Sequence, residues 1–254
     1  MSSDQNNENT NSLNILGLKP VGDAIKLTME KSFEAAEAIL SRICLPVAEE
    51  FGLMLQDKVR YWRLKNMVKI IEKTEGKLEF REDKLELKAH PRVVNSILEN
   101  ASWQENEKIQ DLWAGLLASS CSKNHINDDN IIYIEILKQL TPSEAAIINY
   151  WSQQSEIEID DAGIARPDKG ILMSAKEFFQ IVNTEDLDKL NSEINHLKGL
   201  DLIEEGLGLA SGFFYREGNP ELQMGLKISP LALNLYVKGQ GHCGSVKTYL
   251  ESVK

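Results

Sequence analysis

The chain has 254 residues, of which 42% are hydrophobic and 26% charged, a composition typical of a globular protein rather than a disordered or fibrous one. Its 28 basic and 39 acidic side chains give a net charge of −11, which argues against wholesale electrostatic binding to nucleic acid. Cys44, Cys121 and Cys243 lie far apart without a Cys-x-x-Cys pair, so we expect neither a disulfide framework nor a zinc finger, and we predict a cytoplasmic location.

The N-terminal part is predicted to be helical after a short polar start. Residues 1–12 are rich in asparagine and lack the basic and apolar regions of a secretory signal, so we expect a disordered leader there. Residues 13–140 are predicted to form a helical domain, with apolar side chains at helical spacing from Ile25 to Leu40. Pro46 either kinks this first helix or begins a new one. No stretch approaches the ~18 uncharged apolar residues of a spanning helix, so we expect no transmembrane segment.

A basic helix is predicted within the segment from Val47 to Glu75. Only Glu72 opposes the six basic residues of positions 58–73, which are Lys58, Arg60, Arg63, Lys65, Lys69 and Lys73. Such a helix can bind nucleic-acid phosphates or lie on an anionic membrane, and Arg60, Arg63, Lys65 and Lys69 are the candidate phosphate- or lipid-binding residues. Alternatively, this face is solvated and pairs with the C-terminal region, where residues 141–254 carry 10 basic and 17 acidic side chains.

The helix that follows has the clearest apolar pattern of the chain. Ser102 and Glu105 have the spacing of a capping box, which predicts a helix start at Ser102. Behind them apolar residues follow the spacing of a helix that faces a core: Ile109, Leu112, Trp113, Leu116 and Leu117. We therefore predict that Trp113 is buried. The apolar run from Ile131 to Leu140 fits a short helix better than a buried strand.

Residues 141–238 are predicted to form a winged-helix-like α+β domain. Thr141 with Glu144, and Ser174 with Glu177, have the spacing of capping boxes, and a helix is predicted from Thr184 to Lys198. Leu202–Ile203 and the alternating run Leu222–Ile228 indicate strands, and Ser229 with Pro230 caps a last helix. A long polar connection is expected at 152–170 and a tail at 239–254. The overall fold class is thus mainly α, with a helical domain followed by the winged-helix-like one.

DNA reading by this second domain is disfavoured by charge. The predicted third helix carries four acidic side chains against Lys189 and Lys198, and each carboxylate near a phosphate would repel it. We therefore prefer a domain that docks a protein partner or mediates self-association. Nucleic acid and peripheral membrane contact stay as alternatives through the basic helix.

Motifs of catalysis are absent from the sequence. There is no Gly-x-Gly-x-x-Gly, P-loop, Gly-x-Ser-x-Gly or His-Glu-x-x-His pattern, and the four histidines, His90, His125, His196 and His242, are scattered. The adjacent His242 and Cys243 lie in a glycine-rich tail that is poorly suited to catalysis. The acidic residues of 156–168 lack the spacing of an EF-hand. We expect no catalytic residue, no metal ligand and no cofactor.

Three stretches together resemble a known family. They are Gly52–Leu55 leading into Asp57–Asn66, then Leu112–Ser119 with the pattern Leu-Trp-Ala-Gly-Leu-Leu-Ala-Ser, and then Ile134–Pro142, which ends in Leu-Thr-Pro. Their order and spacing resemble the Abi-alpha family of bacterial abortive-infection proteins over about residues 17 to 205. The resemblance implies a component of phage defence and brings no established catalytic residues. Our leading hypothesis is a non-catalytic defence protein that acts through protein interaction, and the alternative is a DNA- or membrane-binding regulator that uses the basic helix.

Overall fold

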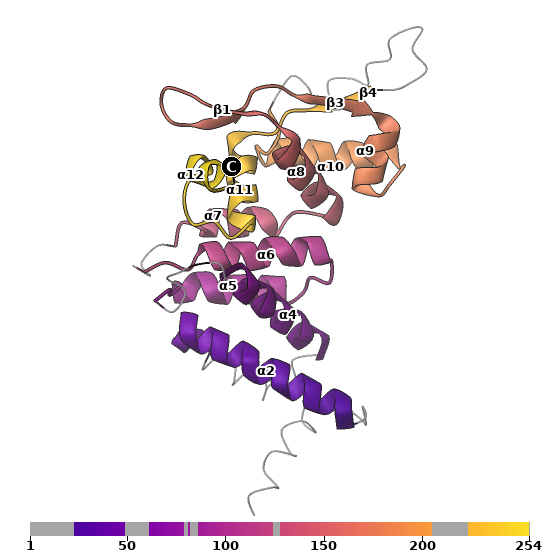
Figure 1. The fold of residues 1–254 in the computed structure, drawn as a ribbon. Helices are drawn as coiled ribbons and strands as arrows, with labels where there is room; N and C mark the ends of the chain where they lie inside the picture. Colours follow the sequence, from indigo (N-terminus) through magenta and orange to yellow (C-terminus); the bar gives the residue numbers. More distant parts are fainter. Residues whose placement is uncertain are drawn as a thin grey trace, which may run out of the picture. The chain divides into compact units, whose positions relative to one another are not determined.

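The computed structural model describes residues 23–48, 61–78, 81, 86–123, 128–204 and 223–253, and most of these residues are helical (Figure 1). The predicted mainly α-helical class is therefore confirmed. The chain divides into two compact units, residues 1–134 and 135–254. The expected leader, residues 49–60 of the Val47–Glu75 segment with Lys58 and Arg60, and the glycine-rich stretch 205–222 lie outside the described residues.

The first unit is built from helices packed on a central one. It contains α2 (Asp23–Ile43), α4 (Tyr61–Leu78), α5 (Pro91–Ala101) and α6 (Glu107–Ser119), and α4 packs against both α2 and α6. Residues 45–48 form a new helical turn after Cys44, so Pro46 begins a helix rather than kinking α2. Helix α6 is buried along most of its length, and Trp113 is 0% exposed, which confirms its predicted place in the core.

The start of α6 differs from the prediction. Ser102 does not begin this helix: its backbone N–H donates to the carbonyl of Leu98 at 3.0 Å, which ends α5 instead. Asn106 is the N-cap of α6, and its side-chain oxygen accepts from the N–H groups of Lys108 and Ile109 at 3.0 and 3.2 Å. The correction has a local cause, because Asn caps a helix as well as Ser does and lies closer to the apolar run.

The helices of the second unit begin largely where the sequence predicts. They are α8 (Pro142–Gln154), α9 (Ala175–Val182), α10 (Leu187–Gly199), α11 (Pro230–Gly239) and α12 (Val246–Ser252), while α7 (Ile131–Leu137) spans the division between the units. Both predicted capping boxes, at Thr141 and Ser174, are formed, and Ser229 caps α11. Helix α10 begins later than residue 184 because Asp186 supplies its N-cap. Helix α12 lies where only a tail was expected.

Two antiparallel strands accompany these helices. Strand β3 (Ile171–Ser174) pairs with β4 (Gln223–Leu226), with Ile171 opposite Leu226. The alternating run thus contains a strand. The strand expected at Leu202–Ile203 is reduced to a single bridge between Ile203 and Ile228. Apart from a hairpin between α8 and β3, the order along the second unit is α8, β3, α9, α10, a bridge residue, β4, α11 and α12.

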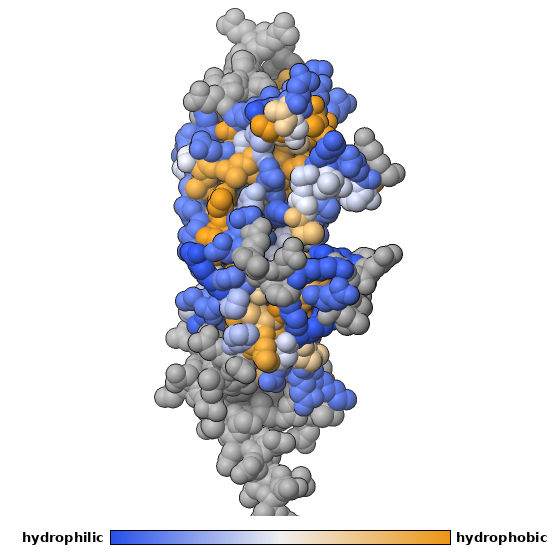
Figure 2. Space-filling view, turned by 90° about the vertical axis from the view of Figure 1, so that its left-hand side faces the viewer, coloured by the Kyte–Doolittle hydropathy of each residue, from blue (hydrophilic) through white to orange (hydrophobic). Residues whose placement is uncertain are grey.

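A β-hairpin replaces part of the polar connection expected at 152–170. Strands β1 (Ile157–Ile159) and β2 (Ala165–Pro167) pair antiparallel, and β2 packs against α11 (Figure 1). The hairpin was not predicted because its strands have only three residues each, which is too short for a pattern of period two to stand out. Figure 2, where the left side of Figure 1 faces the viewer, shows orange hydrophobic and blue hydrophilic residues side by side on this face.

Candidate functional site

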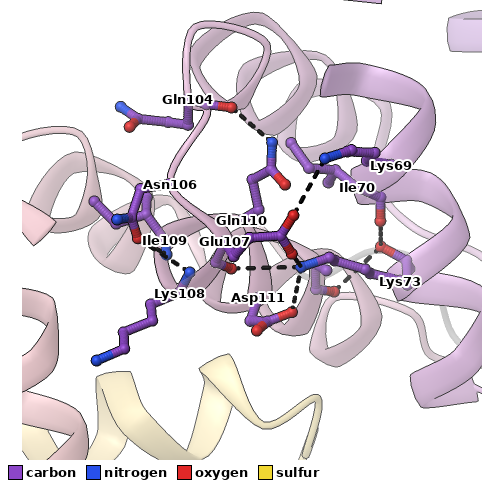
Figure 3. A network of polar contacts seen from close by, with 12 residues as sticks. Lys69, Ile70, Lys73, Gln104, Asn106, Glu107, Lys108, Ile109, Gln110 and Asp111 are labelled. Carbon is purple, nitrogen blue, oxygen red and sulfur yellow. Dashed lines mark hydrogen bonds and ion pairs between the residues drawn. The ribbon is translucent and has the colours of Figure 1, made fainter. Parts of the chain in front are cut away.

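The predicted basic segment is helical from Tyr61 to Leu78, which is α4. This helix packs against acidic residues of α6. Lys69 pairs with Glu107 at 3.2 Å, and Lys73 pairs with Glu107 at 2.9 Å and with Asp111 at 2.8 Å (Figure 3). Glu107 and Asp111 belong to the first two turns of α6. The partners of these two lysines thus come from the same unit, rather than from the acidic C-terminal region that the sequence suggested.

The titration behaviour of this network follows from its charges. Hydrogen bonds from Lys73 and Lys69, together with their positive charge, lower the pKa of Glu107. Partial burial disfavours the charged form of Lys73, but hydrogen bonds to Asp111 and Glu107 outweigh that effect, so the pKa of Lys73 is raised. Both groups therefore stay ionised across the neutral range, and the two lysines are engaged within the protein.

Buried polar contacts also join α4 to α6 and to the turn before α6. The Asn66 side chain donates to the carbonyl of Ser102 at 3.0 Å, and the Gln110 amide donates to Gln104 at 2.8 Å and to the side-chain oxygen of Asn66 at 3.3 Å. The Thr74 hydroxyl lies within hydrogen-bonding distance of the carbonyl oxygen of Ile70 in α4 and of the carbonyl oxygen of Ala114 in α6. Buried polar groups are stable only when paired, so these contacts fix the register of α4 on α6.

Of the remaining candidate residues, the structure describes Arg63 and Lys65, whose surroundings differ. Arg60 is outside the described residues. The guanidinium of Arg63 is half-buried, donates from Nε to the Ser102 hydroxyl at 3.1 Å and lies 4.2 Å from the ring centroid of Trp103. Lys65 is exposed and forms no ion pair with the residues that the structure describes. Among the described candidates, Arg63 is thus held by Ser102 and Trp103, Lys65 is exposed and Lys69 pairs with Glu107.

An exposed aromatic corner adjoins Arg63. Trp103 is 52% exposed, and its ring makes an edge contact with Trp62 at a centroid distance of 5.4 Å. Lys65, three positions after Trp62 on the basic helix, is also exposed. Sequence reasoning noted Trp62 but missed Trp103, which lies 41 positions away in the turn between α5 and α6.

The second unit holds a buried polar cluster that sequence reasoning also missed. Glu144 is completely buried, yet Oε1 lies 2.7 Å from Nδ1 of His196, and Oε2 accepts from the N–H of Thr141 at 2.7 Å. The hydroxyl of Thr141 donates to Oε1 of Glu193 at 3.0 Å. Glu193 is 6% exposed, and its Oε2 has no partner among the described residues. The one visible signal was the capping box that contains Glu144.

The other residues considered for chemistry are held in local contacts. His242 lies 2.9 Å from the hydroxyl of Thr248 and packs against the ring of Tyr249, while Cys243 is exposed. Across the described ranges, no group of three or more His, Cys, Asp or Glu side chains is placed to hold a metal ion. Nor is any helix of the described chain long and apolar enough to cross a membrane.

Comparison with known proteins identifies the family. The family model of abortive infection alpha matches residues 63–223, which is more than half of the chain and includes the basic helix from Arg63 onward, α6 and α10. The match starts later and ends later than the stretch 17–205 over which the sequence resembles the family. No curated protein and no solved structure matches the chain. The chain belongs to the Abi-alpha family, whose name denotes abortive infection, a form of defence against phages.

Proposed function

We propose that this protein protects bacterial cells against phage through contact with a protein partner or a second copy, in the cytoplasm and without catalysis of its own. Family membership supports the defence role. The observation that favours protein contact is the use of Lys69 and Lys73 inside the first unit, where Glu107 and Asp111 neutralise them. Lysines that already pair with carboxylates contribute little to the affinity for nucleic acid. That affinity comes from unpaired basic side chains, which neutralise phosphates and release their counterions.

We further propose that the second unit is a winged-helix-like domain used for docking rather than for reading DNA. Apart from the β1–β2 hairpin after α8, its order of α8, β3, α9, α10 and β4, with Ile203 bridged to Ile228, supports this arrangement. On α10 the exposed charged residues include Asp188 and Lys189, while Glu193 points inward to Thr141. A helix with so little positive charge is a poor match for the major groove, and it suits a protein surface better.

The defence role is tested by infecting cells that do or do not express the chain. Abortive infection predicts that plaque formation falls, that cultures survive at a low ratio of phage to cells, and that infected cells are lost at a high ratio. Equal plaque numbers with and without the protein, against a panel of unrelated phages, would contradict the proposal. Survival of the infected cells themselves would point to a different form of defence.

The second candidate function is a regulator that binds DNA or an anionic membrane through the basic helix. The exposed Lys65, next to the Trp62–Trp103 corner, is the observation that favours it. Binding of duplex DNA and flotation with anionic liposomes should then fall steeply as salt rises, and Lys65→Glu should weaken both. Lys138→Glu in the other unit is a matched control, since Lys138 pairs with Glu135 at 3.0 Å. Absence of binding at low salt would remove this candidate.

A further inference from the structure

The β1–β2 hairpin leaves one of its two edges open. Backbone bonds from Asp168 N–H to Glu156 and from Asp160 N–H to Ile164, at 2.8 and 3.0 Å, flank the ladder. Because such bonds involve every second residue of an antiparallel strand, Glu158 is the residue of β1 that faces β2. The N–H and C=O groups of Ile157 and Ile159 therefore point away from β2. In the described chain this sheet has no third strand to meet them.

The opposite edge of the hairpin is closed. Ala165 and Pro167 of β2 are buried, and β2 packs against α11. Pro167 lacks an N–H, so it removes one of the donors that a further strand would need on that side. Ile159, in contrast, is 41% exposed on β1. Strand β1 thus offers both backbone groups and apolar side-chain surface, whereas both outward-facing residues of β2 are buried.

The turn of the hairpin is held by its own side chains. The Asp160 carboxylate accepts from the N–H groups of Ile164 and Ala162 at 2.8 and 3.0 Å, and from Arg166 Nε at 3.3 Å. The bond from Ile164, outweighing slight desolvation and aided by Arg166, lowers the pKa of Asp160. Gly163 has a φ of +81°, which a residue with a Cβ adopts only with strain. The edge is therefore presented by a preorganised turn, which reduces the entropy lost on binding.

The charge around this edge is strongly acidic. Residues 156–169 carry five acidic and two basic side chains. Asp160 already engages Arg166, and Lys169 pairs with Asp168 at 3.2 Å. The pKa of Lys169 is raised by Asp168 and further by the charges of Glu156 and Glu158. The two basic residues are thus engaged, and negative charge is left over at Glu156, Glu158 and Asp161.

We propose that the outer edge of β1 binds an extended, basic segment of a partner protein, which adds to the hairpin as a third strand. The backbone groups of Ile157 and Ile159 would supply the hydrogen bonds, as in other cases of strand addition. A lysine or arginine of the segment would lie beside Glu158, where opposite charges on neighbouring strands stabilise the pair. A second copy of β1 is disfavoured, because homotypic pairing would place the glutamates of both copies on one face.

A synthetic peptide of alternating lysine and valine is a direct probe of this edge. Its binding to the full chain is measured by fluorescence anisotropy, and hydrogen exchange at the amides of Ile157 and Ile159 is measured with and without it. We expect saturable binding and slower exchange at both amides. A peptide of alternating glutamate and valine should not bind. Unchanged exchange at Ile157 and Ile159 in the presence of bound lysine–valine peptide would overturn the proposal.

Two variants on one residue separate the backbone from the side chain. Ile159→Pro removes an outward N–H as Pro167 does on the other edge, and should weaken binding about tenfold. Ile159→Thr keeps the N–H and should bind like the wild type within about threefold. Glu158→Lys should reverse the preference towards the glutamate–valine peptide. Equal binding by Ile159→Pro and Ile159→Thr would contradict the proposal, and if the proline variant does not fold, the exchange measurement decides.

This inference rests on protein contact as the proposed mode of action, but the two can fail separately. Peptide binding is measured without phage. If the wild-type protein binds the peptide but does not reduce plaque numbers, the defence role is contradicted and the proposed binding at β1 still stands. If the protein protects against phage but does not bind the peptide, the proposed binding at β1 is contradicted and the defence role still stands.

Discussion

Nδ1 of His196 lies 2.7 Å from Oε1 of Glu144, although 52 positions separate the two residues in the chain. Glu144 is fully buried and also completes the capping box of α8 through its contact with the N–H of Thr141. The same carboxylate therefore satisfies the first turn of α8 and joins it to α10. A buried carboxylate is costly unless it is paired, so this contact orders the second unit.

Thr141→Val should destabilise the protein more than a surface change of equal size. The hydroxyl of Thr141 accepts from the N–H of Glu144 and donates to Glu193, so its removal loses the cap and leaves a buried carboxylate oxygen without its donor. We expect a loss of about 1–3 kcal/mol in the free energy of unfolding, measured in urea. Thr141→Ser keeps the hydroxyl and is the control. An unchanged unfolding midpoint in Thr141→Val would show that these bonds contribute nothing.

Substitutions of Trp113 distinguish a role in folding from a direct role in defence. Trp113 is fully buried, and its indole N–H has no partner in the part of the chain that the structure describes. Trp113→Ala should cost roughly 3–5 kcal/mol and reduce the yield of folded protein. Trp113→Phe fills most of the space and removes the unpaired N–H, so it should cost roughly 1–2 kcal/mol. A Trp113→Ala protein that melts like the wild type but gives no protection would instead assign Trp113 a direct role in defence.

The ion pairs between α4 and α6 should weaken in acid. The lowered pKa of Glu107 means that its stabilising effect is present above 4.5, the ordinary value for a glutamate, and is lost as the pH falls through the folded-state pKa. The thermal midpoint of the wild type should therefore exceed that of Glu107→Gln at neutral pH and converge with it in acid. Glu105→Gln, on an exposed residue outside this network, is the control. A difference that persists at pH values well below the folded-state pKa would contradict the electrostatic cause.

Local signals in the sequence predicted much of the fold. The capping boxes at Thr141 and Ser174 were found because all their residues lie within four positions. Trp113 was placed in the core because the apolar spacing of α6 is regular. The false start at Ser102 shows the limit, since Ser and Asn both cap helices and only the packing of Ser102 beside Arg63 and Asn66 separates them.

Features that depend on distant residues could not be predicted. The charge of the basic helix was visible, but its partner Glu107 lies 34 positions from Lys73, and no local pattern links them. His196 and Glu144, which are in contact, are separated by 52 positions in the sequence. Strand β1 has three residues, so its open edge became evident only once its pairing with β2 was known.

The most direct test of how the chain acts is the plaque-forming efficiency of phage on cells that express Ile159→Pro, Ile159→Thr or Lys65→Glu at equal protein levels. If protection depends on a protein partner at the β1 edge, Ile159→Pro should lose protection while Ile159→Thr and Lys65→Glu keep it. If Lys65→Glu loses protection and Ile159→Pro keeps it, the basic helix is the functional surface and the account based on protein contact at β1 is wrong.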